Sequence, residues 1–230
     1  MCLLLICGAN SFAQREVTKF LGIPVDGYRS EMRKKLIEKG FTPKNLGREE
    51  YFEGEFNGMD VEVFIVTNNN KVYRIMVRDK YKCGESQIKT RFNRLVSQFE
   101  KNKRYSHFED NQSLADDEDI SYEMMVHKKE YQASFYQNPE DEDKFNQFVT
   151  ERGMLLAEDI KGKYSEEELS NPTEEMQKEM YSYALDKAYD LFMEYLAKKS
   201  VWFRIGEDYG RYYIIMYYDN AYNQADGEDL

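Results

Sequence analysis

The pattern of hydrophobic and polar residues in the first half of the chain predicts a helix, an antiparallel meander and a second helix. An extended apolar segment covers 20–27 and ends in turn residues, and a helix is predicted over 29–39. The apolar side of this helix and its closing glycine are Met32, Leu36, Ile37 and Gly40. Three strands are then predicted over 51–56, 60–67 and 71–78, because Asn-rich and Gly-containing turns separate them.

A strongly amphipathic helix follows the meander. Its apolar residues recur at helical spacing with basic residues between them: Ile88, Phe92, Leu95, Val96 and Phe99. Residues 109–119 hold six acids and no base, which predicts a solvated loop. After it we expect a hairpin of strands over 120–126 and 130–137, a helix over 142–159, a polar irregular stretch over 161–172 and a long helix over 173–199.

The chain is expected to close with a third hairpin, of strands over 200–205 and 211–219. The second of these strands contains seven successive apolar residues, so both of its faces should be covered and the strand should be central in its sheet. We expect the long helix that precedes the hairpin to cover one of these faces. The tail over 219–230 alternates oxygen-bearing and small residues, and an ordered tail capped by Asx turns is favoured over a calcium site, whose spacing it does not match.

These elements predict an α+β fold in which antiparallel meanders and hairpins pack with amphipathic helices. Charge divides the chain: residues 14–105 carry a net charge of +7 and residues 106–230 carry −18. We interpret this division as two complementary halves, 14–105 and 106–230, that attract each other and pack as one globular unit. The alternative is a basic face for anionic lipid or polysaccharide.

The first 13 residues predict export. The run from Cys2 to Cys7 is apolar, and small residues at Ser11 and Ala13 fit a signal peptidase, so cleavage is expected after Ala13. The basic region that normally precedes such a run is missing, which places the expected start codon upstream. A lipoprotein modified at Cys7 and a buried N-terminal strand are the alternatives. The mature protein is therefore expected in the periplasm or outside the cell.

Composition narrows the class of protein. The chain has 230 residues, a net charge of −11 and 15% aromatic residues, which favours a folded chain over a disordered acidic one. It has no basic excess and no membrane-length apolar run, so neither a nucleic-acid partner nor a membrane span is expected. After cleavage Cys83 is the remaining cysteine, so no disulfide is expected within the chain.

Catalytic motifs for nucleotide, metal-peptidase and serine-hydrolase chemistry are absent from the sequence. Only His107 and His127 could assist a nucleophile at Cys83, and we favour a structural role for all three. No catalytic residue, cofactor or metal ligand is therefore assigned. The many carboxylates leave open a two-carboxylate hydrolase acting on glycan or peptide. Trp202, Tyr213 and Tyr217 are the candidate partner-binding residues, since aromatic side chains on strands can anchor a partner.

Four blocks carry a resemblance to a known group of proteins: Phe20 to Gly27, Glu53 to Gly58, Val66 to Ile75 and Tyr217 to Asn220. Together they resemble a family of exported proteins of unknown function from Bacteroidota-type bacteria. The order of helix and meander is more remotely similar to envelope modules of the SmpA/OmlA and β-lactamase-inhibitor-like type. That similarity implies protein binding, although the turn at Asp26-Gly27 is offset from the turn of those modules.

The function expected from the sequence is therefore an exported, non-catalytic binding or protein-interaction module of the bacterial envelope. Its partner is expected to be a protein or glycan of the envelope. The carboxylate-dependent hydrolase is the alternative.

Overall fold

The computed structural model describes residues 16–140 and 142–225, and these divide into two compact units. The sheet unit contains residues 17–138 and 190–225. The helical unit contains residues 139–189, together with Glu16. The signal sequence expected over residues 1–13 lies outside the described residues. The fold is α+β, as predicted.

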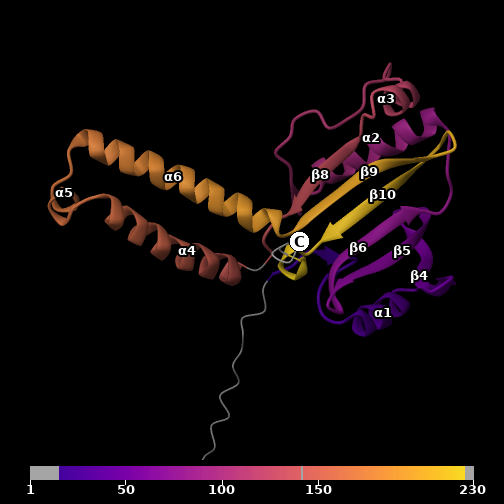
Figure 1. The fold of residues 1–230 in the computed structure, drawn as a ribbon, viewed down its shortest axis with the longest axis horizontal. Helices are drawn as coiled ribbons and strands as arrows, with labels where there is room; N and C mark the ends of the chain where they lie inside the picture. The colour runs from indigo at the N-terminus through magenta and orange to yellow at the C-terminus, as the bar shows by residue number, and fades with distance from the viewer. Residues whose placement is uncertain (1–15, 141, 226–230) are drawn as a thin grey trace, which may run out of the picture. The chain divides into compact units, whose positions relative to one another are not determined.

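Within the described residues, the sheet unit is built on one eight-stranded antiparallel sheet with the order β3-β4-β5-β6-β10-β9-β8-β7 (Figure 1). The strands are β3 (Thr42–Leu46), β4 (Glu49–Phe56), β5 (Met59–Asn68), β6 (Lys71–Asp79), β7 (Tyr105–Ser106), β8 (Gln132–Gln137), β9 (Ser200–Asp208) and β10 (Arg211–Asp219). A two-stranded ribbon, β1 (Lys19–Phe20) and β2 (Ile23–Pro24), precedes them.

The predicted meander is confirmed as β4, β5 and β6. Its turns use left-handed backbone at Asn57 and Gly58 (φ 53° and 73°) and at Asn69 and Asn70 (φ 47° and 63°), conformations that Asn and Gly adopt readily. The structure adds an edge strand, β3, that the pattern did not predict. This strand contains Pro43 and has mostly exposed side chains, so it lacks the alternation that marks a half-buried strand.

The two halves of the chain share the sheet, because β10 pairs with β6 from the first half and with β9 from its own hairpin. In this register Tyr217 lies opposite Met76 on one side and Trp202 on the other. The division expected near residues 105 and 106 therefore falls inside the sheet unit. The β9–β10 turn is the two-residue pair Tyr209-Gly210, both with positive φ.

The hydrophobic core lies on one face of the sheet, under α1 (Arg29–Glu38) and α2 (Glu85–Lys101). Both helices were predicted, and Met32 and Leu36 of α1 are fully buried, although Ile37 is exposed. From β10 the core takes the alternate residues Tyr212, Ile214, Met216 and Tyr218. Ring contacts join α2 to the strands: the Phe92 and Phe203 centroids are 5.1 Å apart.

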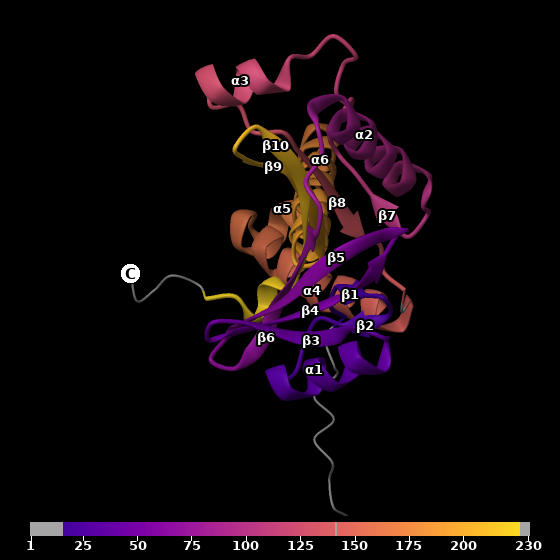
Figure 2. The same cartoon turned by 90° about the vertical axis from the view of Figure 1, so that its right-hand side faces the viewer.

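β10 is central and mostly buried, as its apolar run predicted. The helix that packs against it is α2, whereas we expected the helix directly before the final hairpin. In Figure 1, α2 lies behind strands β9 and β10, and Figure 2 shows it to one side of them.

The expected strand over 120–126 is wrong, because this segment forms the helix α3 (Ile120–Val126). Asp119 caps the helix by accepting a hydrogen bond from the Tyr122 amide at 2.8 Å. Ile120 and Met124, one helical turn apart, both face the core. The other half of the expected hairpin is correct as β8, but its partners are β7 and β9.

The helical unit contains α4 (Glu142–Lys163), α5 (Glu166–Ser170) and α6 (Glu174–Ala197), whose last eight residues belong to the sheet unit. The two long helices were predicted. The stretch expected to be irregular contains α5, and Ser165 and Glu168 form its capping box. In the described residues no helix combines the length and apolarity needed to cross a bilayer.

The C-terminal tail is ordered as far as it is described. It continues as the short 3-10 helix η1 (Ala221–Asn223), for which the Asn220 side chain accepts a hydrogen bond from the Tyr222 amide. The Asn220 amide group donates to the Val25 carbonyl oxygen at 2.8 Å, and that of Asn223 to the Val72 carbonyl oxygen at 2.8 Å. The expected Asx capping is thus present over 219–225.

Candidate binding surface

The face of the sheet opposite the core carries a continuous group of aromatic, arginine and aliphatic side chains. Because neighbouring residues of a strand point to opposite faces, this face takes the positions that alternate with the core residues of β6, β9 and β10. We call it the aromatic face, and it consists of Arg74, Met76, Arg78, Trp202, Arg204, Tyr213, Ile215 and Tyr217. Figure 1 looks onto this side of the sheet.

All three residues singled out from the sequence, Trp202, Tyr213 and Tyr217, lie on the aromatic face. Tyr217 and Trp202 are direct cross-strand neighbours, and their rings stack with centroids 4.1 Å apart. Tyr213 lies four residues before Tyr217 in β10, on the same face of the sheet, with Ile215 between them. Trp202 and Tyr213 are partly exposed, whereas Tyr217 is buried. The strands therefore bring the predicted residues together.

Arg74 and Asp219 complete a cluster around the two stacked rings. Asp219 accepts two hydrogen bonds from the Arg74 guanidinium, at 2.5 and 2.8 Å, and one from the Trp202 indole at 2.9 Å. The guanidinium lies 4.7 Å from the centre of the Tyr217 ring. Its hydrogen bonds to Asp219 raise the pKa of Arg74, so this cluster stays charged and paired.

The Tyr213 ring packs against Gly206 of the neighbouring strand β9. A Cβ atom at Gly206 would lie 2.7 Å from two carbons of the Tyr213 ring, so the ring occupies the space that a larger residue at 206 would need. An aromatic ring that covers a cross-strand glycine protects the exposed backbone of that strand.

The middle of the aromatic face alternates apolar and charged side chains. Ile215 lies in register between Arg78 of β6 and Arg204 of β9. Arg78 pairs with Glu62, and its guanidinium lies 5.2 Å from the centre of the Phe64 ring. Arg204 faces Glu130 with 3.7 Å between charged atoms. Aromatic and arginine side chains are the residue types that most often anchor protein interfaces, and this face combines both.

Sequence reasoning missed the arginines of this face. Strand alternation alone places Arg74 and Arg78 on one side of β6. Their position beside Trp202 and Ile215 depends on the pairing of β6 with β10, which joins segments about 140 residues apart. No local signal in the sequence carries that register.

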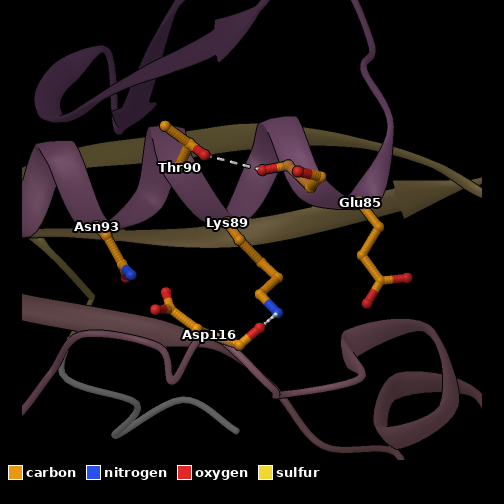
Figure 3. Close-up of a pocket in the computed structure, with 6 residues that line it drawn as sticks. Glu85, Lys89, Thr90, Asn93 and Asp116 are labelled. Carbon is orange, nitrogen blue, oxygen red and sulfur yellow. Dashed lines mark hydrogen bonds between the residues drawn. The ribbon is translucent and has the colours of Figure 1, made fainter.

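A polar pocket of about 410 Å³ lies elsewhere in the sheet unit, between α2 and the loop before α3 (Figure 3). It is lined by Glu85, Ser86, Lys89, Thr90, Asn93 and Asp116.

The side chains of this pocket mostly tether the loop to α2. Lys89 Nζ donates to the carbonyl oxygens of Asp116 and Glu118 at 2.5 and 2.7 Å. Asn93 exchanges two hydrogen bonds with the backbone of Leu114. The Glu85 carboxylate accepts hydrogen bonds from the Ile120 amide and from the Ser121 hydroxyl.

Two acids of the sheet unit, Asp79 and Asp219, are buried, and each is neutralised by an arginine. Asp79, at the end of β6, forms an ion pair with Arg91 of α2. Its carboxylate also accepts a hydrogen bond from the Ile214 amide of β10 at 3.0 Å. This carboxylate therefore joins a helix to two strands. A general acid of a glycosidase instead needs a raised pKa and access to substrate. The geometry of these two acids is that of structural ion pairs.

Cys83 and the two histidines lie apart from the aromatic face. Cys83 forms a backbone bridge with Tyr212, on the core side of β10, and burial raises the pKa of its thiol. His127 pairs with Glu123 one helical turn earlier, and His107 contacts the Glu109 carbonyl. Within the described residues no group of three or more His, Cys, Asp or Glu side chains is arranged to hold a metal ion.

Comparison of the chain with protein-family models, with curated proteins and with solved structures finds no match in any of the three. The resemblance to exported proteins of Bacteroidota-type bacteria therefore stays a prediction.

Proposed function

We propose that this protein is an exported, non-catalytic binding module of the bacterial envelope and that it binds its partner through the aromatic face. The observation that carries the proposal is the gathering of Trp202, Tyr213 and Tyr217 with three arginines on the face opposite the core. Export rests on residues 1–13, whose apolar run and small residues before Gln14 are typical of a signal peptide. A protein partner of the envelope fits better than a glycan, because the arginines add charge to the aromatic anchors.

Within the aromatic face, Tyr213 is the residue best suited to meet a partner. Trp202 and Tyr217 already use their polar atoms or ring faces in the cluster with Arg74 and Asp219. Tyr213 is partly exposed and packs on Gly206, so part of its ring is accessible to a partner. Loss of this ring should therefore weaken binding with little effect on folding.

The test is a quantitative pull-down of the mature protein from envelope extract. The proposal predicts an enriched partner whose recovery falls at least fivefold with Tyr213→Ala. Tyr209→Ala is the matched control, because Tyr209 is on the adjacent turn and is 98% exposed. Equal recovery by wild type and Tyr213→Ala would contradict the proposal.

The alternative, a carboxylate-dependent hydrolase, is tested at the polar pocket, which contains the carboxylates of Glu85 and Asp116. A screen of glycosidase and peptidase substrates separates the two functions. Activity that disappears in both Glu85→Gln and Asp116→Asn variants would favour the hydrolase over the binding module.

A further inference from the structure

Helix α6 carries an apolar stripe that faces away from its neighbour in the helical unit. Tyr181, Leu185 and Tyr189 are spaced four residues apart, so they lie along one side of the helix. Their side chains are 71%, 53% and 56% exposed. A single exposed apolar residue is ordinary on a protein surface, but an aligned group of three is not. We call these three residues the α6 stripe. Three aligned large side chains form a continuous surface that water solvates poorly.

The opposite side of α6 is the one that contacts α4. The Tyr183 hydroxyl donates a hydrogen bond to Asp159 of α4, and Lys163 Nζ lies 3.5 Å from the centre of the Tyr183 ring. Successive residues in a helix are 100° apart, which places Tyr183 on the far side from Tyr181. Helix α6 is thus apolar on two sides, and α4 uses one of them.

The helical unit does not close a core of its own. None of the side chains described between residues 142 and 189 is buried. A pair of helices gains most of its stability from packing an apolar face, so an unused face of this length is costly to leave in water. The α6 stripe is therefore suited to a partner.

Charge indicates what that partner is. Residues 139–189 contain 14 acids and 6 bases, a net charge of −8. Two exposed acids lie next to the α6 stripe: Asp186 directly follows Leu185, and Glu174 lies about two helical turns before Tyr181, with the exposed Lys178 between them. Two copies of this unit repel each other, and so do this unit and an anionic lipid or nucleic acid. A basic segment with an apolar side complements both the α6 stripe and the net negative charge of this unit.

We propose that the α6 stripe binds a basic amphipathic helix of a partner protein, with the apolar side of that helix on Leu185 and its lysines or arginines beside Glu174 and Asp186. This is the helix-in-groove mode of recognition, in which anchors at helical spacing meet an apolar surface. The inference is independent of the proposed function, because it concerns a different unit of the chain from the aromatic face.

The experiment uses the mature full-length protein and a fluorescein-labelled 18-residue peptide of leucine and lysine patterned as an amphipathic helix. Fluorescence anisotropy at 50 mM salt measures the dissociation constant. We expect a double variant, Leu185→Ser with Tyr189→Ser, to weaken binding at least tenfold. A charge variant, Glu174→Lys with Asp186→Lys, should weaken it at least fivefold, and the weakening should shrink at 500 mM salt.

Two controls separate the α6 stripe from general stickiness. Met154→Ser changes an apolar residue of α4 that is 64% exposed and should leave binding within twofold. A peptide of the same composition with its leucines scattered around the helix should bind at least tenfold more weakly. Circular dichroism should be unchanged in all variants, because the substituted side chains are exposed.

Three results would overturn the inference. The first is no saturable binding of the patterned peptide by wild type. The second is equal binding by wild type and the Leu185→Ser, Tyr189→Ser variant. The third is a concentration-dependent dimer, seen by sedimentation, that the same variant dissociates, since a second copy would then occupy the α6 stripe. Each of these results leaves the Tyr213 pull-down unaffected.

Discussion

Ile215 offers a test of the aromatic face in which the sign of an introduced charge decides the result. This residue lies in register between Arg78 and Arg204, so both of its cross-strand neighbours are cations. Ile215→Asp places an anion between two guanidinium groups, and Ile215→Lys places a third cation there. Both variants lose the burial of an isoleucine that is 8% exposed.

The size of the effect follows from burial and from cross-strand pairing. Losing the buried isoleucine costs about 1.5–3 kcal/mol of unfolding free energy in either variant. A cross-strand pair of opposite charges contributes about 0.2–1 kcal/mol, and a like-charged pair is unfavourable by a similar amount. With two neighbours, Ile215→Asp should be more stable than Ile215→Lys by about 0.8–4 kcal/mol.

Met216 provides the control on the other face of the same strand. Its cross-strand neighbours are Val77 and Phe203, both buried in the core. Met216→Asp would bury a carboxylate without a cationic neighbour in the register, and it should cost at least about 4 kcal/mol or prevent folding.

Urea unfolding at pH 7, followed by circular dichroism and by Trp202 fluorescence, measures all three variants. The expected order of stability is Ile215→Asp, then Ile215→Lys, then Met216→Asp. The difference between the two Ile215 variants should narrow in 1 M salt, because the charges are partly exposed. Equal stability of Ile215→Lys and Ile215→Asp, or of Ile215→Asp and Met216→Asp, would contradict this prediction.

Three further predictions concern the core side of the sheet unit. Gly54→Ala should destabilise the protein by about 1–2 kcal/mol in urea unfolding, because the new Cβ would lie 2.5 Å from the buried Phe41 ring, and Phe41→Leu in the same chain should relieve part of this cost. If the effects of the two substitutions on the free energy of unfolding are additive, residues 54 and 41 are not in contact. Asp79→Asn should cost about 3–5 kcal/mol by leaving the buried Arg91 charge without its partner, and a cost below about 1 kcal/mol would show that the pair is dispensable. Cys83 should react with iodoacetamide with an apparent pKa above that of an ordinary thiol, since burial raises its pKa and keeps it protonated at neutral pH. The rate of Cys83 alkylation, followed by peptide mass mapping from pH 7 to 10, measures this apparent pKa. A midpoint of the rate at or below about pH 8.5 would contradict the prediction.

Most of the regular elements could be predicted from the sequence, because their signals are local. The helix that contains Phe92 and Phe99 shows a clear apolar spacing, and the Asn-Gly turn at 57 and 58 fixes the meander. The apolar run of β10 predicted a central strand, and the sheet order confirms it.

The errors arise where local signals are weak or compete. Residues 120–126 are as rich in β-forming types as in helix formers, and the Asp119 cap and the packing of Ile120 and Met124 decide in favour of the helix. Strand β3 has little alternation and depends on its pairing with β4. In both segments a tertiary contact overrides an ambiguous pattern.

The candidate site was predictable in part. Aromatic residues on predicted strands suggested Trp202, Tyr213 and Tyr217, and the even spacing of Tyr213 and Tyr217 is consistent with the one face on which they lie. The partners of the cluster, Arg74 and Asp219, come together through pairing between distant parts of the chain and a bidentate ion pair. Neither the periodicity nor the composition of the chain carries that information.

Site-specific photo-crosslinking tests the proposed role of the aromatic face most directly. p-Benzoylphenylalanine is introduced at position 213 or at position 122, which replaces a half-exposed tyrosine of α3 as the matched control. Both proteins are expressed with the signal sequence in the bacterium of origin and irradiated in intact cells. The account predicts one discrete crosslinked product from position 213 that is missing from position 122. It would be contradicted by a product from position 122 alone, or by no product from position 213 when the protein is folded and exported.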